Sequence, residues 1–220
     1  KNNKLNLSQE RFFASPISAK KAKDKTKWII PIKFEKNKVN YGEAGFFRTA
    51  YSKDLLEKLK VPIENKLLSA RDRLGIIRDL FALAEAGSIP TTNALEFLSA
   101  YKNEDNYTVW LELAMGLGRL EALLAHPAND GLRGKLDRLI IELFSPSFER
   151  LGWKKKGSET HADSLLRSLV IGRLGRSGHK EIVAEARNKF QKNDIHPDIR
   201  GAVYAVVASS GGKKEYESFV

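Results

Sequence analysis

The residues of this chain that could do chemistry are four histidines and many serines, and neither set falls into a catalytic pattern. The histidines are His126, His161, His179 and His196. None of them stands in H-E-x-x-H and no two lie four residues apart, so a helical zinc motif of that kind is absent from the sequence. The serines include no G-x-S-x-G, and the chain contains no cysteine. We therefore predict no catalytic, cofactor-binding or metal-binding residue in these 220 residues.

Two further groups could suggest a site, but each has a more common structural interpretation. His161 and Asp163 could form a weak ligand pair, whereas a histidine and an acid in the first turn of a helix are far more usual. Gly116 and Gly118 lie inside an amphipathic helix instead of between a strand and a helix, so they predict no phosphate-binding loop. Small residues there would instead allow another helix to come close.

Three charged residues fall on expected helices, where a structural role is favoured. Arg73 and Asp79 could pair with one another or hold neighbouring loops, and Arg167 could do the same. We expect all three to be structural and not catalytic.

The positive charge of the chain is concentrated near its beginning. The net charge is +11, and residues 1–60 contain 15 Lys/Arg against 6 Asp/Glu. Much of this excess lies in one lysine run, formed by Lys20, Lys21, Lys23, Lys25 and Lys27. Such a run could bind phosphate or nucleic acid. The favoured interpretation is a solvated loop between two strands, because no aromatic residue interleaves with the lysines to stack on bases.

The secondary structure that must position any site changes near Ser52, from a pattern of strands to a pattern of helices. Before it, apolar residues alternate with the short period of strands, at Lys4–Ala14, at Thr26–Glu35, and from Val39 through Gly45–Tyr51. Pro31 places the second strand at an edge or a bulge. Three strands cannot close a sandwich by themselves, so residues 1–51 predict a partial β-sandwich domain.

After Ser52 the pattern is helical, with Ser69 and Asn106 as expected N-caps and Gly87 as an expected left-handed stop. Pro146 should kink its helix or split off the last turn. The expected helices are Lys53–Leu59, Ala70–Ala86, Pro90–Tyr101, Tyr107–His126, Gly131–Leu151, Ser158–Gly175, Lys180–Phe190 and Pro197–Ser209, followed by the first turns of another helix after Gly212.

The helices recur in pairs, which predicts a mainly α fold. Successive pairs repeat at roughly 35–45 residues, the range of two-helix solenoid repeats. We expect residues 52–220 to form an irregular α-solenoid of antiparallel helix pairs, similar to HEAT or armadillo repeats, and to stop before the solenoid is complete. An ordinary helical bundle is the alternative.

A series of motifs in one order resembles the C-terminal half of the gluzincin zinc aminopeptidases, and especially the puromycin-sensitive type. The first three motifs are W-x-x-P-I, N-x-G-x-x-G-F-F-R-x-x-Y and D-R-x-x-I-I-x-D-x-F-x-L-A-x-A-G, which start at Trp28, Asn40 and Asp72. The remaining matches are E-x-x-Y-x-x-W from Glu104, L-G-W from Leu151, the stretch Glu159–Phe190, and P-x-I-R-x-x-V-Y from Pro197. The resemblance covers essentially the whole chain. One departure is the spacing, since only eight residues separate Pro31 from Asn40, fewer than is usual in the family.

The resemblance implies the end of a β-sandwich and the first part of a helical solenoid from a zinc metallopeptidase. In that family the zinc ligands and the exopeptidase motif lie in earlier domains, where a zinc-polarised water attacks the first peptide bond with a glutamate as base. Neither H-E-x-x-H nor G-[AG]-M-E-N occurs here, so no catalytic residue can be transferred to this chain. The resemblance then implies a part that caps the active site, shapes the peptide chamber, packs on the catalytic domain and is inactive alone.

Two other functions remain open from the sequence. One is a free-standing helical-repeat scaffold that binds protein partners, and the other is nucleic-acid binding through the lysine run. We do not expect nucleic acid as a partner, since no aromatic residue interleaves with the lysines. We expect no membrane partner either, since no apolar run is long enough to span a bilayer. Absence of cysteine favours a cytoplasmic location, and we expect the natural N-terminus to lie before Lys1.

Overall fold

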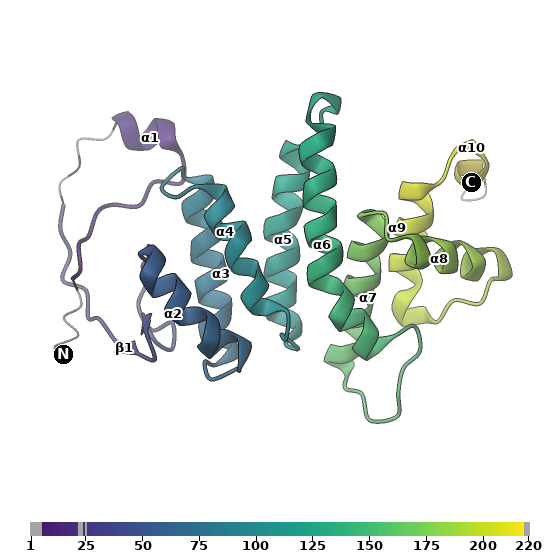
Figure 1. The fold of residues 1–220 in the computed structure, drawn as a ribbon, viewed down its shortest axis with the longest axis horizontal. Helices are drawn as coiled ribbons and strands as arrows, with labels where there is room; N and C mark the ends of the chain where they lie inside the picture. Colours follow the sequence, from purple (N-terminus) through teal and green to yellow (C-terminus); the bar gives the residue numbers. More distant parts are fainter. Residues whose placement is uncertain (1–5, 22–23, 25, 218–220) are drawn as a thin grey trace. The chain divides into compact units, whose positions relative to one another are not determined.

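The computed structural model describes residues 6–21, 24 and 26–217, and its fold is mainly α (Figure 1). This confirms the fold class expected from the sequence. The α-helices are α1 (Pro16–Lys21), α2 (Lys53–Glu64), α3 (Ala70–Glu85), α4 (Thr91–Phe97), α5 (Tyr107–Leu123), α6 (Asp130–Leu151), α7 (His161–Arg176), α8 (Lys180–Lys192), α9 (Arg200–Ser210) and α10 (Lys213–Glu217). Short 3-10 helices are η1 (Leu98–Tyr101), η2 (Pro127–Asn129) and η3 (Pro197–Ile199).

The chain forms two compact units. The first contains the residues up to Ile63 together with Leu67–Phe97, and the second contains Glu64–Lys66 together with the residues from Leu98 onward. Apart from the last residue of α2, the first unit thus holds α1 to α4, and the second holds α5 to α10.

The three strands expected before Ser52 are wrong in extent. Among the described residues, sheet structure is confined to one antiparallel pair, β1 (Phe34–Glu35) with β2 (Lys38–Val39), in which Phe34 faces Val39. Residues 6–14, 26–33 and 45–51 form no strand, and α1 was not expected at all. The first two residues of the first expected strand, at positions 4 and 5, lie outside the described residues.

The reason is visible where the first two expected strands meet. The side-chain amide of Gln9 donates to the carbonyl of Trp28 at 2.8 Å, and its oxygen accepts from the Trp28 N–H at 2.7 Å. The Gln9 side chain thus occupies the donor and acceptor that a neighbouring backbone would use in a ladder. Alternation therefore marked two segments that meet at Gln9 and Trp28 but could not supply the backbone partner that makes a strand.

Helices α2 and α3 begin where the sequence predicts them, after Ser52 and Ser69. The hydroxyl of Ser69 accepts a hydrogen bond from the Asp72 N–H at 3.1 Å, which fixes the first turn of α3. At the other end, Gly87 has a φ of 70°, a left-handed conformation that glycine adopts without penalty. The expected helix beginning after Ser52 forms and extends to Glu64, with Pro62 inside it.

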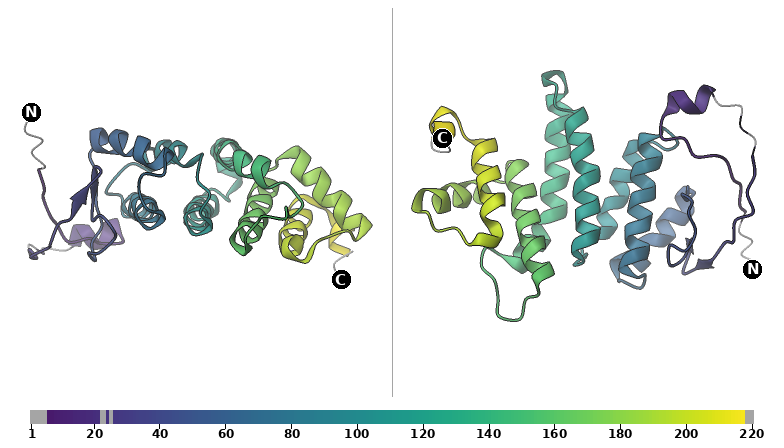
Figure 2. Two further views of the ribbon diagram at one scale, coloured as in Figure 1. Left: turned by 90° about the horizontal axis from the view of Figure 1, so that it is seen from below. Right: turned by 180° about the vertical axis from the view of Figure 1, so that it is seen from behind.

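In the second unit, successive helices pack side by side. Figure 2 shows α5 and α6 running antiparallel, and Trp110 of α5 meets Phe144 of α6 with ring centroids 4.5 Å apart. Helix α7 packs on α6 and on α9, and α8 packs on α9. Close contact of α7 with α9 depends on Gly175, because a Cβ there would lie 2.2 Å from Val206.

Helix α6 runs unbroken through Pro146, so the expected splitting of its last turn is wrong. A proline costs one backbone hydrogen bond in a helix interior. Packing of Ile140, Phe144 and Leu151, all essentially buried, holds the helix together on both sides of the proline. Tertiary burial therefore outweighs the local preference.

Candidate functional site

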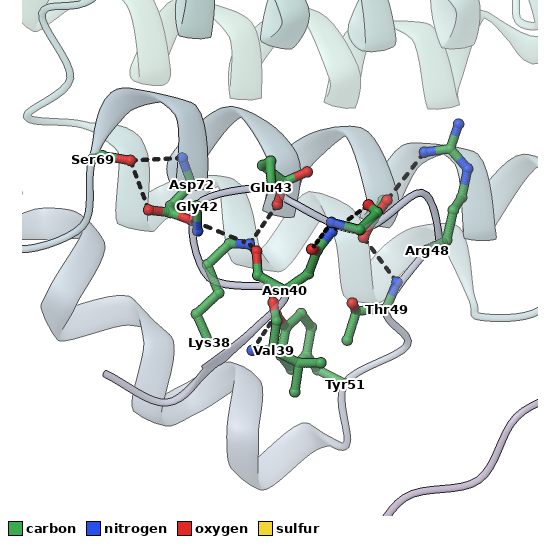
Figure 3. A network of polar contacts seen from close by, with 12 residues as sticks. Lys38, Val39, Asn40, Gly42, Glu43, Arg48, Thr49, Tyr51, Ser69 and Asp72 are labelled. Atoms are coloured by element: carbon green, nitrogen blue, oxygen red, sulfur yellow. Dashed lines mark hydrogen bonds and ion pairs between the residues drawn. The ribbon is translucent and has the colours of Figure 1, made fainter. Parts of the chain in front are cut away.

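The first motif-rich region is a polar network that joins residues 38–51 to helix α3 (Figure 3). Lys38 lies at its centre with a relative exposure of 1%. Its ammonium donates to the carbonyl of Asn40 at 2.9 Å and to the carboxylate of Glu43. The Lys38 Nζ also lies 3.4 Å from Oδ1 of Asp72. A buried charge needs such partners, and here two carboxylates and the backbone provide them.

The loop that follows Lys38 is shaped by its own side chains. Asn40 has a φ of 57°, and its amide oxygen accepts from the Gly45 N–H at 2.7 Å while its amide nitrogen donates to the Gly45 carbonyl. The Gly42 N–H donates to Oδ1 of Asp72 at 2.6 Å. The N-x-G-x-x-G spacing therefore encodes a folded loop that is fastened to α3.

A second fastening lies further along α3, at Asp79. Arg48 donates to Oδ1 of Asp79 at 3.1 Å, and the Thr49 N–H donates to Oδ2 at 2.8 Å. Burial raises the pKa of Asp79 to about 6, against the opposing effect of the Thr49 and Arg48 hydrogen bonds. This is the loop-holding role expected for Asp79.

Tyr51 completes this region by closing the loop on itself. Its hydroxyl donates to the carbonyl of Val39 at 3.1 Å and accepts from the Val39 N–H at 3.2 Å. Burial raises the pKa of Tyr51 well above its ordinary value. The charged and phenolic groups of this region thus hold the chain, and they are not arranged as a nucleophile with its base.

The other motifs also serve to join helices. The Glu104 carboxylate accepts from the Asn106 N–H at 2.9 Å, and the Trp110 indole donates to the Glu104 carbonyl at 2.9 Å. Arg167 of α7 donates to the carbonyl of Gly152 at 3.1 Å and to the Glu159 carboxylate. Arg73 donates to the carbonyl of Leu68 at 2.7 Å. Arg73 and Arg167 thus hold neighbouring loops, as expected.

The four histidines lie at the beginnings of helices. His126 and His196 each accept a backbone N–H through Nδ1 at 3.2 Å, from Ala128 and Asp198. His179 precedes α8, and His161 is the first residue of α7 after a capping box made by Thr160 with Asp163. His161 and Asp163 therefore lie in the first turn of α7, the placement expected from the sequence.

A metal centre has no suitable donor set in the described part of the chain. No group of three or more His, Cys, Asp or Glu side chains there lies close enough to hold a metal ion. A catalytic zinc site needs three protein ligands around one ion. The described residues therefore do not fit a resident zinc.

The lysine run is only partly described. Lys20 and Lys21 end α1 and are exposed, and the ammonium of Lys27 donates to the carbonyl of Gln9. Lys23 and Lys25 lie outside the described residues. Among the described helices, none is long and apolar enough to cross a membrane.

A large hollow lies in the second unit, on helices α5, α7 and α9. It is a groove of about 500 Å³, lined by apolar and small side chains with two arginines, Arg173 and Arg176. Small residues from each helix, Ala114 and Gly118 from α5, Gly172 from α7 and Ala205 from α9, leave the space open. The groove can accept an extended chain or an apolar side chain.

Sequence reasoning missed the charged cluster that holds Arg173 at this groove. Nη1 of Arg173 donates to Oε2 of Glu121 at 2.7 Å, and Nη2 of Arg133 donates to Oε1 at 3.3 Å. Helical spacing places Glu121 and Arg173 on their own helices, but only the packing of α5 on α7 brings them together. The one signal that the sequence offered for this pair was Glu121, an acidic residue on an otherwise apolar face of α5.

Comparison with known proteins identifies a family that this chain matches. The ERAP1-like C-terminal domain family matches residues 37–220. The chain is 33% identical over 193 residues to aminopeptidase M1-A of Oryza sativa subsp. japonica, covering 83% of this chain and 22% of that protein. It is 34% identical over 193 residues to aminopeptidase M1 of Arabidopsis thaliana, with the same coverage of both.

A third relative is the puromycin-sensitive aminopeptidase of Caenorhabditis elegans, 31% identical over 188 residues, covering 83% of this chain and 20% of that protein. The matched region thus spans about a fifth of the length of these relatives. The motif resemblance found in the sequence is confirmed, and the chain belongs to the ERAP1-like C-terminal domain family, with aminopeptidases as its relatives.

Proposed function

We propose that this chain serves as the C-terminal portion of a zinc-dependent aminopeptidase that removes N-terminal residues from peptides. The observation that carries the proposal is the family match over residues 37–220, together with relatives that are named aminopeptidases. In this role the chain caps the active site and shapes the peptide chamber, and it packs on a catalytic domain encoded elsewhere in the parent protein.

The same proposal gives the chain two parts with different folds. In this proposal, residues 1–51 are part of a β-sandwich domain, and residues 52–220 are the first part of a helical solenoid domain. The polar network of Lys38, Asp72 and Asp79 would then be the junction between these parts, since it joins the segment before Ser52 to α3. Such contacts would limit movement of the segment before Ser52 relative to α3.

The chemistry of peptide hydrolysis would then reside outside this chain. The zinc of the parent enzyme would be held by a catalytic domain, since the described residues here offer no ligand set for it. The contribution of this chain would be to position and enclose peptides, which affects how substrates of different length are bound. A cytoplasmic location is part of the same proposal.

The first experiment is hydrolysis of an alanyl or leucyl amide by the purified chain with added zinc, combined with metal analysis. No turnover and no bound metal are expected. Turnover that a chelator abolishes would overturn the proposal, because it would require a metal site within this chain.

A second experiment separates an enzyme part from a free-standing scaffold. The gene should encode a domain with H-E-x-x-H before Lys1, and that domain should be expressed with and without this chain. Omission of the chain should change KM for longer peptides more than KM for amino-acid amides. A gene that lacks such a domain would favour the scaffold.

A further inference from the structure

Arg173 lines the groove on α5, α7 and α9 with unused hydrogen-bond donors. Its side chain is 9% exposed, and its Nη1 donates to the Glu121 carboxylate. Its Nε and Nη2 are buried and have no hydrogen-bond partner within the described residues. A buried guanidinium usually has its donors satisfied, because an unpaired buried donor is costly. The groove therefore lacks an acceptor at this position.

Glu121 cannot fully satisfy Arg173, because it is shared. One oxygen of Glu121 accepts from Arg173 and the other lies 3.3 Å from Arg133. Arg176, one turn further along α7, also lines the groove and is exposed. The groove thus has a positive end, where a further carboxylate would find complementary charge.

Gly118 provides access to this end. A Cβ at Gly118 would lie 3.8 Å from Nη1 of Arg173 and 3.9 Å from Oε2 of Glu121. Because glycine has no side chain, the space directly above the Arg173–Glu121 pair stays open. The Nε and Nη2 atoms of Arg173 have almost no exposed surface, so the guanidinium must turn toward this space to meet an incoming group.

We propose that this groove binds a peptide segment through a glutamate side chain flanked by apolar residues. The apolar lining, which includes Leu111, Met115 and Leu169, accepts the flanking side chains. The unpaired atoms of Arg173 are below the surface, so the carboxylate must be carried on a stem, as it is in glutamate. A terminal carboxylate attached directly to the backbone would stay at the level of the lining. The inference extends the proposed function, since peptides are the substrates proposed for the parent enzyme, but its test needs no hydrolysis.

The test is NMR of the arginine Nε–H groups in the full chain during titration with the capped peptide acetyl-Ala-Leu-Glu-Leu-Ala-amide. The Nε–H signal of Arg173 should shift with this peptide, and replacement of its Glu by Gln should weaken binding about tenfold. Equal binding of the Gln peptide would overturn the proposal. So would a Gln peptide with a free C-terminal carboxylate that binds more tightly than the capped Glu peptide.

A variant of Gly118 tests the same groove without disturbing the fold. Gly118→Ala fits the space at ordinary contact distances and favours the helix, so the fold should be kept. Its methyl group would occupy the space beside Nη1 of Arg173 into which the guanidinium turns, and binding of the Glu peptide should weaken about tenfold. The matched control is Gly201→Ala on α9, where a Cβ would meet nothing within 4 Å. Unchanged binding by Gly118→Ala, or equal weakening by Gly201→Ala, would overturn the proposal, and neither result bears on whether the parent enzyme hydrolyses peptides.

Discussion

Lys38 and Asp72 form an ion pair from which water is almost excluded: each is 1% exposed, and Nζ lies 3.4 Å from Oδ1 (Figure 3). Asp72 is at the same time the acidic residue in the first turn of α3 and the acceptor for the Gly42 N–H. One carboxylate therefore serves the helix, the loop and the buried lysine together.

Replacing Lys38 by Met should strongly destabilise the first unit. The change leaves Asp72 buried without its cation, and loss of one partner from a buried pair costs about 3–5 kcal/mol. Urea unfolding of the two proteins would measure the difference in free energy. Lys213→Met is the control, since Lys213 pairs with Glu217 on the surface and its loss should cost less than about 1 kcal/mol. Equal stability of Lys38→Met and the wild type would contradict the role given to Lys38.

Asp79 should make stability depend on pH between about pH 4 and pH 6. Burial raises its pKa from 3.8 to about 6 in the folded protein. The folded state then binds more protons than the unfolded state in this range, so the free energy of unfolding falls as pH rises through it. The full effect is about 3 kcal/mol. Asp79→Asn should flatten this part of the pH profile, and a profile with an unchanged slope would show that another group causes it.

Arg167→Lys should weaken the joint between α6 and α7. The guanidinium of Arg167 reaches the carbonyls of Leu151 and Gly152 as well as the Glu159 carboxylate. A lysine carries one ammonium and cannot reproduce this fork, so we expect a loss of about 1–3 kcal/mol. Thermal unfolding monitored by circular dichroism would measure it. Arg150→Lys, at a partly exposed pair with Asp163, is the control and should have little effect.

Gly175→Ala should destabilise the contact between α7 and α9, although alanine is the better helix former. A Cβ at Gly175 would lie 2.2 Å from a methyl of Val206, and Val206 is fully buried. Overpacking of this kind costs about 1–3 kcal/mol. The same change at Gly172 meets only Ala202 at 3.8 Å and should be tolerated. Equal stability of Gly175→Ala and Gly172→Ala would contradict this prediction, because it would mean that α9 can shift away from α7 at no cost in free energy.

The helices could be predicted from the sequence because their signals are local. Ser69 and Asn106 cap α3 and α5 as expected, with hydrogen bonds to N–H groups two or three residues on. Strands were overestimated because a strand needs a backbone partner from elsewhere in the chain. At Trp28 a glutamine side chain took that place. The split expected at Pro146 was wrong for a related reason, since the local cost was considered without the burial around it.

The two charged centres could not be predicted from spacing. Lys38 lies among polar residues and a glycine-rich loop, a pattern typical of an exposed turn, yet the structure buries it. Arg173 and Glu121 are separated by 52 residues. Their meeting depends on the angle and register at which α5 packs on α7, which no local pattern specifies.

The close approach at Gly175 has a consequence for how the second unit opens. Helix α9 packs on α7 and α8, and its main contacts lie within this stretch of chain. Because the close approach at Gly175 joins α9 to α7 over an extensive contact, these two helices should open together and not one at a time. Native-state hydrogen exchange should therefore give the amides of α7 and α9 similar opening free energies.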